Sequence, residues 1–239
     1  MIQRVSIESL KFENLSFSFD KRSRIIDNCS FEFPMNQNVW IKAESGSGRS
    51  TLLQILGVLQ LPHSGGYFIN GENICEMSFE EFLPYRLNIG FGFDQGGVIH
   101  NRTIFENLML PLLYHKIGNP IDAMDRVDDF LAHMGIMKYR DQRPSLVPGT
   151  VRKIACLLRA LVMHPELVLL DDPSVGLGQE AALKYFDLIK MLREKNQLKH
   201  VFISSFDEKI MSLIEHSEIF IDSGILHFST EPERKVVAL

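Results

Sequence analysis

Residues 43–51 (Ala-Glu-Ser-Gly-Ser-Gly-Arg-Ser-Thr) carry glycines, hydroxyls and one cation between an apolar strand-like run at 38–42 and a helical pattern at 51–56. Glycines let successive backbone N–H groups face one anion, and the helix N-terminus adds partial positive charge. The phosphate-binding motif is G-x-x-x-x-G-K-[ST]; here Ala43 stands for its first glycine and Arg49 for its lysine. The predicted nucleotide contacts are Ser45, Gly46, Ser47, Gly48, Arg49, Ser50 and Thr51.

Arg49 has two interpretations at this point: contact with a nucleotide phosphate, or simple capping of the loop. Its planar guanidinium is bulkier than an ammonium and is not an equivalent point charge in a tight loop. The strand before it, the helix after it and the neighbouring Ser50 favour phosphate contact.

Two carboxylates follow a short, wholly apolar run at 167–170, which is typical of a strand buried in a parallel sheet. A carboxylate at the end of such a strand is costly unless it has a partner. We therefore predict that Asp171 binds Mg²⁺ together with Ser50.

The composition limits the possible functions. The chain has 239 residues, of which 45% are hydrophobic and 23% charged, and a net charge of −5, which argues against nucleic-acid binding by phosphate neutralisation. Its three cysteines are scattered without metal or redox spacing, which favours a reduced, cytoplasmic setting. Nothing reaches the ~18–20 apolar residues of a membrane span, so any membrane role is expected through a partner.

Strand-like and helix-like patterns alternate along the chain, which predicts an α/β fold. A helical block from about 102 to 163 separates the phosphate loop from the later strands. The expected strands are 4–8, 11–19, 29–34, 38–43, 65–70, 89–93, 167–170 and 200–204, and the expected helices are 50–60, 122–134, 179–195 and 207–215, with a terminal hairpin around 222–224.

The order and spacing of these motifs resemble the ATP-binding subunits of ABC transporters over essentially the whole chain. Besides the phosphate loop and the 167–172 strand, the resemblance rests on Arg159-Ala160-Leu161 before His164-Pro165, on 89–93 followed by Asp94, and on the spacing of Thr103, Glu106-Asn107 and Pro111. It implies a P-loop NTPase with a RecA-like core, an N-terminal β-subdomain and an inserted α-helical subdomain at about 96–163. Residues 1–239 would form a single nucleotide-binding domain.

The resemblance also implies site residues and their ligands, ATP and Mg²⁺. Phe19 falls where the family places an adenine-stacking aromatic, although it could be an ordinary strand aromatic. Asp94 stands at the Q-loop glutamine, and Gln95 beside it is an alternative after a one-residue slip. Asp172 stands at the glutamate that polarises water, and Ser205 at the switch histidine.

These departures predict impaired hydrolysis. The Asp172 side chain is one methylene shorter than glutamate, and a misplacement of ~1 Å can cost about 10²-fold. General acid–base assistance, which Ser205 cannot give as an imidazole does, is typically worth about 10²–10⁴-fold. At the position of the family's signature sequence, Pro148 offers neither a hydroxyl nor an N–H as a hydrogen-bond donor. Thr150 adds a side chain where the backbone would have to approach a phosphate closely. Gly178 replaces the D-loop aspartate.

The resemblance implies an ATP-binding subunit bound to the cytoplasmic face of an inner-membrane permease and paired with a second ATPase chain, a heterodimer being favoured. Residues 71–77 and 93–97 are most similar to the ATPase subunits of Mla/MCE-type lipid-transport systems. Two alternatives stay open. One is a pseudo-ATPase that regulates or supports a competent partner, and the other is a nucleotide-dependent switch protein without transport.

Overall fold

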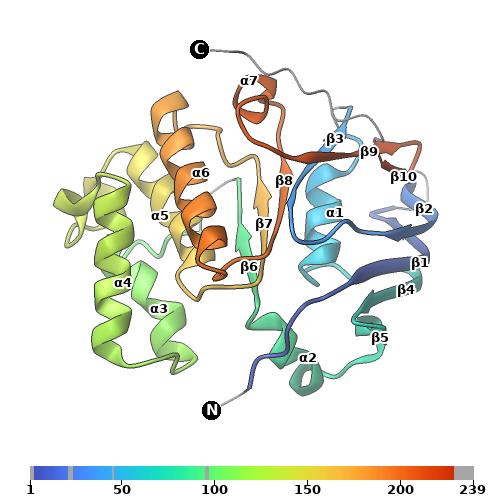
Figure 1. The fold of residues 1–239 in the computed structure, drawn as a ribbon, viewed down its shortest axis with the longest axis horizontal. Coiled ribbons are helices and arrows are strands. Elements are labelled where there is room, and N and C mark those ends of the chain that lie inside the picture. Colours follow the sequence, from blue (N-terminus) through green and yellow to red (C-terminus); the bar gives the residue numbers. More distant parts are fainter. Residues whose placement is uncertain (1–2, 21–23, 45, 95–96, 229–239) are drawn as a thin grey trace.

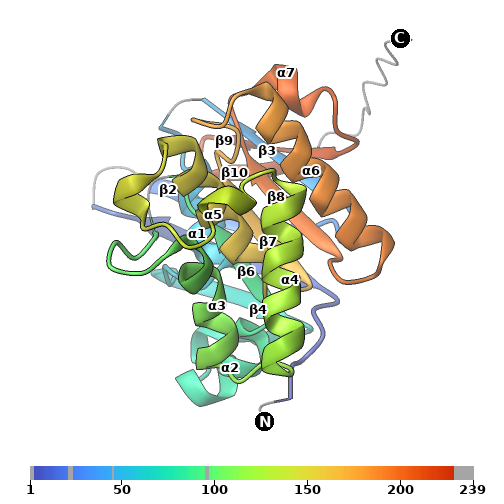
Figure 2. The ribbon, with the colours of Figure 1, turned by 90° about the vertical axis from the view of Figure 1, so that its left-hand side faces the viewer.

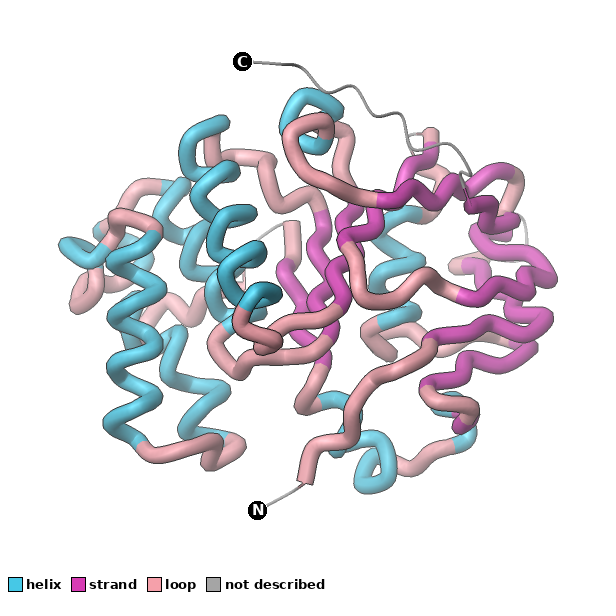
Figure 3. Tube along the Cα trace, in the orientation of Figure 1, coloured by secondary structure: helices cyan, strands magenta, loops and turns pink. Residues whose placement is uncertain are grey.

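A central sheet of six strands organises the computed structural model, which describes residues 3–20, 24–44, 46–94 and 97–228 (Figures 1 and 3). Its strand order is β10-β9-β3-β8-β7-β6. The strands from β9 to β6 run parallel, and β10 is antiparallel to β9. The six strands are β3 (Asn38–Ala43), β6 (Ile89–Gly92), β7 (Leu167–Asp171), β8 (His200–Ser204), β9 (Ser217–Asp222) and β10 (Ile225–Phe228).

A second, antiparallel sheet has the order β2-β1-β4-β5 and lies with α1 on one side of the central sheet, at the right of Figure 1. Its strands are β1 (Leu10–Ser18), β2 (Arg24–Glu32), β4 (Ser64–Ile69) and β5 (Glu72–Asn73). The helices α3 to α6 lie on the opposite side, in front of the central sheet in Figure 2.

The α-helices are α1 (Arg49–Leu56), α2 (Phe79–Arg86), α3 (Ile104–Tyr114), α4 (Pro120–His133), α5 (Gly149–Leu161), α6 (Gln179–Glu194) and α7 (Glu208–Met211). The side chains of Ser78 and Thr103 form capping boxes that begin α2 and α3, each with a glutamate three residues later. Such reciprocal bonds satisfy two backbone donors at a helix start. Asn119 caps α4, whose first residue is Pro120.

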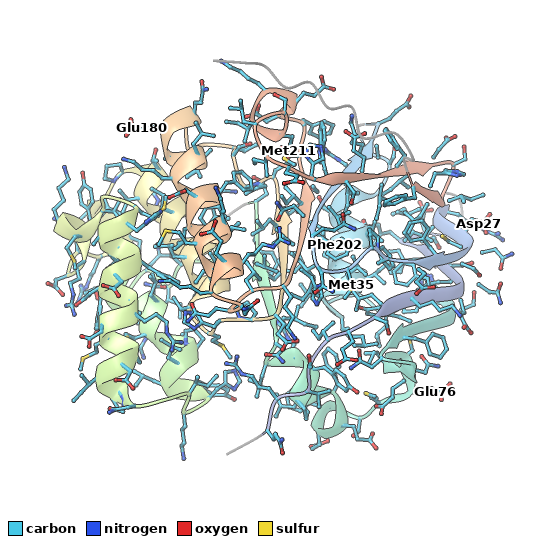
Figure 4. The ribbon with its side chains drawn as sticks, in the orientation of Figure 1. Asp27, Met35, Glu76, Glu180, Phe202 and Met211 are labelled. Atoms are coloured by element: carbon cyan, nitrogen blue, oxygen red, sulfur yellow. The ribbon has the colours of Figure 1, made fainter. Side chains whose placement is uncertain are left out.

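Two hydrophobic cores occupy the two faces of the central sheet. Along β3, Val39 and Ile41 face the antiparallel sheet and α1, while Trp40 faces the helical side. Alternation of this kind follows from the two-residue period of a strand. Phe202 and Met211 are fully buried, and Figure 4 shows them in the interior, whereas Glu76 and Glu180 lie at the periphery. Both faces of the central strands are therefore covered.

The parallel strands bring their carboxyl ends to one edge of the sheet. Asp171 of β7 is in register with Ser204 of β8, and Ser204 is in register with Ile41 of β3. The loops that follow β3, β6, β7 and β8 therefore meet at this edge, which is the usual place for ligands in open α/β sheets.

The predicted α/β class with a P-loop core is the fold observed. The strand expected at 4–8 is wrong. These residues bond to side chains instead: Val5 O accepts from Asn88 Nδ2 at 2.7 Å, and Ile7 N donates to Glu166 Oε2 at 2.8 Å. A segment satisfied this way has no need of a strand partner.

Several element ends also differ from expectation. The helix expected at 50–60 ends at Leu56, because Gly57 closes it and Val58 takes the left-handed conformation with φ 53°. The helix expected at 207–215 is the single turn α7. Helix α2 was not expected, and it contains Pro84, which usually indicates a break.

Candidate nucleotide-binding site

The loop between β3 and α1 has the backbone conformation that its glycines permit. Gly46 and Gly48 have φ of 82° and 94°, in the left-handed region that favours glycine. A Cβ on Gly48 would lie 2.1 Å from Ile25 Cγ2, so β2 leaves no room for a side chain there. A Cβ on Gly46 would meet no heavy atom of the described residues within 4 Å, apart from its neighbours in the chain, so this part of the loop is open. Ser45 lies outside the described residues.

A hydroxyl–carboxylate pair joins this loop to the end of β7. Ser50 Oγ donates to Asp171 Oδ1 at 2.9 Å, and Ser204 Oγ donates to the same oxygen at 2.7 Å. Asp171 is 8% exposed, so its carboxylate is held by these hydroxyls in a largely water-free place. Oxygen ligands of this kind are the ones Mg²⁺ prefers, so the residues present fit the predicted metal.

Arg49 lies at the first position of α1 and is 7% exposed. Its guanidinium carbon is 3.2 Å from the centre of the Phe206 ring, and Nη2 is 3.7 Å from Asp172 Oδ2. Burial lowers the pKa of this guanidinium, and the carboxylates of Asp172 and Asp171 oppose part of that shift. The cation of the loop is thus held against the loops that follow β7 and β8.

Asp172 occupies a strained backbone position, with φ 41° in a residue other than glycine. Its own N–H donates to Ser204 O at 2.9 Å, and its Oδ1 accepts from Phe206 N at 3.3 Å. Burial raises the pKa of the Asp172 carboxyl above the ordinary 3.8, the Arg49 charge lowers it, and the nearby Asp171 and Asp94 raise it. The carboxylate therefore bridges the phosphate-loop cation and the loop after β8.

Ser205 is 3% exposed and turns into its own loop. Its Oγ accepts from Asp207 N at 3.0 Å, and its carbonyl accepts from Trp40 Nε1 at 2.9 Å. By accepting this bond the hydroxyl helps to fix the conformation of its own loop. Phe206 and Trp40 were both missed as site residues from sequence, since neither belongs to a motif.

Asp94, which follows β6, is held by a lysine that the sequence did not single out. Lys153 Nζ on α5 donates to Asp94 O at 2.6 Å, Phe93 O at 3.3 Å and Asp172 O at 3.2 Å, and its side chain is 9% exposed. Asp94 Oδ1 lies 3.4 Å from the same nitrogen. One cation thus ties α5 to the loops after β6 and β7. Gln95, the alternative Q-loop residue, lies outside the described residues.

The predicted signature residues begin α5. Pro148 is its N-cap, without a side-chain hydrogen bond among the described residues. Thr150 Oγ1 donates to Gly176 O at 3.3 Å, so this hydroxyl bonds to the turn after β7 within the same chain. Gly178 has φ 75° and ψ 158°, a conformation essentially restricted to glycine. An aspartate at Gly178 would need a different backbone.

Phe19 lies beyond β1, with its side chain 65% exposed. Its ring meets Phe17 edge-on at 5.1 Å, and both line a surface depression together with Arg24 and His63. Arg24 in its lining precedes Ile25, whose side chain lies against Gly48 of the phosphate loop. An exposed ring here is available for stacking, and its contact with adenine stays a prediction.

Fold and site together define a P-loop nucleotide-binding protein of the ATP-binding-cassette class. The chain belongs to the ABC transporter family: the family model described as "ABC transporter" matches residues 26–175.

Curated relatives include proteins of several transport systems. The chain is 33% identical over 166 residues to the lipoprotein-releasing system ATP-binding protein LolD 1 of Rhodopseudomonas palustris, covering 69% of this chain and 73% of that protein. It is 28% identical to the ABC transporter ATP-binding protein YtrE of Bacillus subtilis, covering 88% and 93%. It is 29% identical to the methionine import ATP-binding protein MetN of Mannheimia succiniciproducens, but spans only 54% of that relative's length. Of the macrolide export protein MacB of Haemophilus ducreyi, it spans 30%.

Solved structures show the same fold. A dimeric ATP-binding cassette in a post-hydrolysis state, bound to ADP and Pi, superposes with a TM-score of 0.81 at 24% identity, covering 92% of this chain and 97% of that one. Among the helices described in the structure, none has the length and apolarity needed to cross a membrane.

Lys153 generates the first prediction. In the Lys153→Met variant the carbonyls of Phe93, Asp94 and Asp172 lose a charged donor while the apolar stem is kept. We expect the free energy of unfolding to fall by about 2 kcal/mol, since hydrogen bonds to charged groups are worth about 1.5–3 kcal/mol. Urea denaturation followed by circular dichroism measures this. Lys190→Met, which removes a lysine whose side chain is 74% exposed, is the control and should change little. Equal effects of both variants would contradict the assigned role.

Asp172 generates the second prediction, on pH dependence. The pKa of the Asp172 carboxyl is higher in the folded than in the unfolded protein. Its titration therefore contributes to the free energy of unfolding fully at pH values below the unfolded pKa, and this contribution is lost as the pH rises through the folded pKa. The Asp172→Asn variant cannot ionise there. Its free energy of unfolding relative to wild type should therefore increase as the pH rises from near 3.8 through the folded pKa, and then level off.

Urea titrations at several pH values between about 3 and 7 measure this difference, in which the titrating groups that do not interact with Asp172 cancel. The matched control is Asp125→Asn, at an exposed position on α4. A relative stability that stays constant, or that decreases with pH, would show that Arg49 outweighs burial at Asp172.

Proposed function

We propose that this chain is a Mg²⁺- and ATP-binding subunit of an ABC transporter complex in which its own hydrolysis of ATP is very slow or absent. The observation that carries the binding proposal is the 2.9 Å bond from Ser50 Oγ to Asp171 Oδ1. It brings the two predicted metal ligands together beside a loop with left-handed Gly46 and Gly48.

Each residue of the site would have a separate role in binding ATP and Mg²⁺. The backbone N–H groups of the loop and the first turn of α1 would hold the β- and γ-phosphates, and Arg49 would supply their positive charge. Ser50 and Asp171 would hold Mg²⁺, which would supply positive charge to offset the negative charge of the phosphates. Phe19 would stack on the adenine. These roles extend to this chain what the family resemblance implies.

Slow hydrolysis is proposed because the groups near the expected reaction centre are engaged with one another. The Asp172 carboxylate is shared between Arg49 and Phe206 N, and the Ser205 hydroxyl accepts from its own loop. Phosphoryl transfer depends almost wholly on positioning and electrostatics, so such losses affect the chemical step more than binding. Asp94, at the position expected for a glutamine, has no side-chain amide that could order water, and its backbone carbonyl accepts a hydrogen bond from Lys153.

The proposed partners are a permease and a second ATPase chain, with the present chain on the cytoplasmic face of the membrane. A heterodimer is favoured because Pro148 offers no N–H or hydroxyl across an interface and the Thr150 hydroxyl is bonded within the chain. Relatives named for methionine import, macrolide export and lipoprotein release do not define a substrate. Transport of lipid by an Mla/MCE-type system stays part of the proposal. In this complex the chain would act as a regulatory or structural pseudo-ATPase.

Nucleotide binding and turnover give the third prediction. Isothermal titration of the purified chain with ATP should show saturable, magnesium-dependent binding with a Kd between roughly 1 µM and 1 mM, while ATPase activity stays at background. Ser50→Ala should weaken binding in magnesium about tenfold, because one metal ligand and one bond to Asp171 are lost. Its effect in EDTA should be small.

The exposed Ser145→Ala is a matched control for the loss of a hydroxyl. Binding that saturates nowhere below millimolar ATP would refute the binding proposal. Robust turnover that Asp172→Ala abolishes would refute the proposal of slow hydrolysis and leave an active ATPase with unusual residues.

The complex gives the fourth prediction. Mild-detergent purification of the affinity-tagged chain from its native membrane should recover a permease together with a second ATP-binding chain carrying an intact signature. The assembled complex should hydrolyse ATP at a rate that falls at least about tenfold when the partner's catalytic carboxylate is removed, but less than about twofold for Asp172→Asn. Light scattering of the isolated chain with Mg-ATP should show a monomer. An ATP-dependent homodimer, or recovery without a permease, would favour a nucleotide switch.

A further inference from the structure

An exposed aromatic ring covers the phosphate-loop cation. The Phe206 ring lies immediately after Ser205, and the Arg49 guanidinium carbon is 3.2 Å from the ring centre. The two residues differ in exposure: the arginine is 7% exposed and the phenylalanine 57%. An aromatic with most of its surface in water contributes little to a hydrophobic core. The contact with Arg49 is therefore its main interaction in the described part of the chain.

The backbone that carries this ring is fixed from several directions. Phe206 N donates to Asp172 Oδ1 at 3.3 Å, while the carbonyl of the preceding Ser205 accepts from Trp40 Nε1 at 2.9 Å. Asp207 N adds a bond to Ser205 Oγ at 3.0 Å. The loop that carries the ring is therefore held by β3 and by the turn after β7.

We propose that Phe206 is a positioning residue for the bound nucleotide: its ring orients the Arg49 guanidinium toward the β- and γ-phosphates. This inference rests on the proposed function of the site. An arginine needs such a support more than a lysine does, because its planar group binds phosphate well only in the correct plane. A ring face stacked on the guanidinium fixes that plane and stabilises the charge.

The same geometry couples the loop after β8 to the phosphates. Asp172 Oδ2 lies 3.7 Å from Arg49 Nη2, so an incoming phosphate competes with this carboxylate for the guanidinium. Asp172 Oδ1 is also the acceptor for Phe206 N. Displacing the carboxylate therefore disturbs the backbone of residues 205–206. Trp40, the single tryptophan of the chain, is bonded to that backbone and reports the change.

The test compares Phe206→Leu, which keeps an apolar side chain without a ring face, with Phe206→Tyr, which keeps the ring. Titration calorimetry should show Mg-ATP bound about fivefold more weakly by Phe206→Leu, equivalent to about 1 kcal/mol, and within twofold of wild type by Phe206→Tyr. AMP, which lacks the β- and γ-phosphates, should bind all three proteins alike. Phe79→Leu, at a 69% exposed phenylalanine on α2, is the matched control.

Two further measurements separate orientation from simple structural support. In the Arg49→Lys background, adding Phe206→Leu should change the ATP affinity less than twofold, because an ammonium gains less from the ring. ATP should alter the fluorescence of Trp40 in wild type and in Phe206→Tyr, and much less in Phe206→Leu. A general loosening of the fold would weaken the binding of ATP and of AMP equally. A loss of affinity for ATP without a loss for AMP therefore indicates that the ring acts on the β- and γ-phosphates through Arg49.

The stacking of Phe206 on Arg49 is tested in the absence of nucleotide. A failure of this inference can therefore be distinguished from a failure of the proposed function. In the free protein the Nε–Hε resonance of Arg49, assigned through Arg49→Lys, should be shifted upfield by the ring and should move downfield in Phe206→Leu. An unchanged resonance would overturn the inference whether or not ATP binds. If wild type binds ATP and Phe206→Leu binds it equally, the inference fails and the proposed function stands. If wild type binds no ATP, both fail.

Discussion

One carboxylate, that of Asp171, holds the edge of the sheet together where the loops meet. It ends a strand that is buried on both faces, and it accepts from Ser50 of α1 and from Ser204 of the neighbouring strand. A buried charge without such partners would cost several kcal/mol, roughly the range measured when one member of a buried pair is removed. The placement of α1, and with it the conformation of the phosphate loop, depends on this satisfied carboxylate. The next residue, Asp172, can then leave the strand in a strained conformation.

Replacing lysine by arginine in the loop changes what surrounds the cation. An ammonium is a compact point charge, whereas a guanidinium has a flat face that must be covered and an edge that needs acceptors. Here Phe206 covers the face and Asp172 lies at the edge. The short carboxylate, the serine at the switch position and the aromatic after it therefore form one local arrangement around Arg49.

Much of the fold followed from the sequence, because the signals were periodic. The wholly apolar 167–170 run, the glycine-rich loop and the alternation of strands with helices each predict their element from local physics. One failure has a nonlocal cause. Residues 4–8 look like a strand, but Asn88 and Glu166, far away in sequence, satisfy their backbone, and such distant partners leave no periodic trace. The other failure is different, because helix α2 has a local start signal in the capping box of Ser78 with Glu81, and this signal was missed in a segment that contains Pro84.

The proximity of Ser50 and Asp171 was predictable, but the electrostatic partners around them were not. Ser50 and Asp171 were expected together from motif spacing, and the structure joins them directly. Lys153, by contrast, sits in a helix where its spacing indicates only a polar face, yet its nitrogen reaches three backbone carbonyls across two loops. A long flexible side chain can meet distant acceptors only after the fold has formed. Because carbonyl acceptors exist at every residue, no sequence pattern identifies which ones such a lysine will find. Its contribution to the site is therefore visible only in three dimensions.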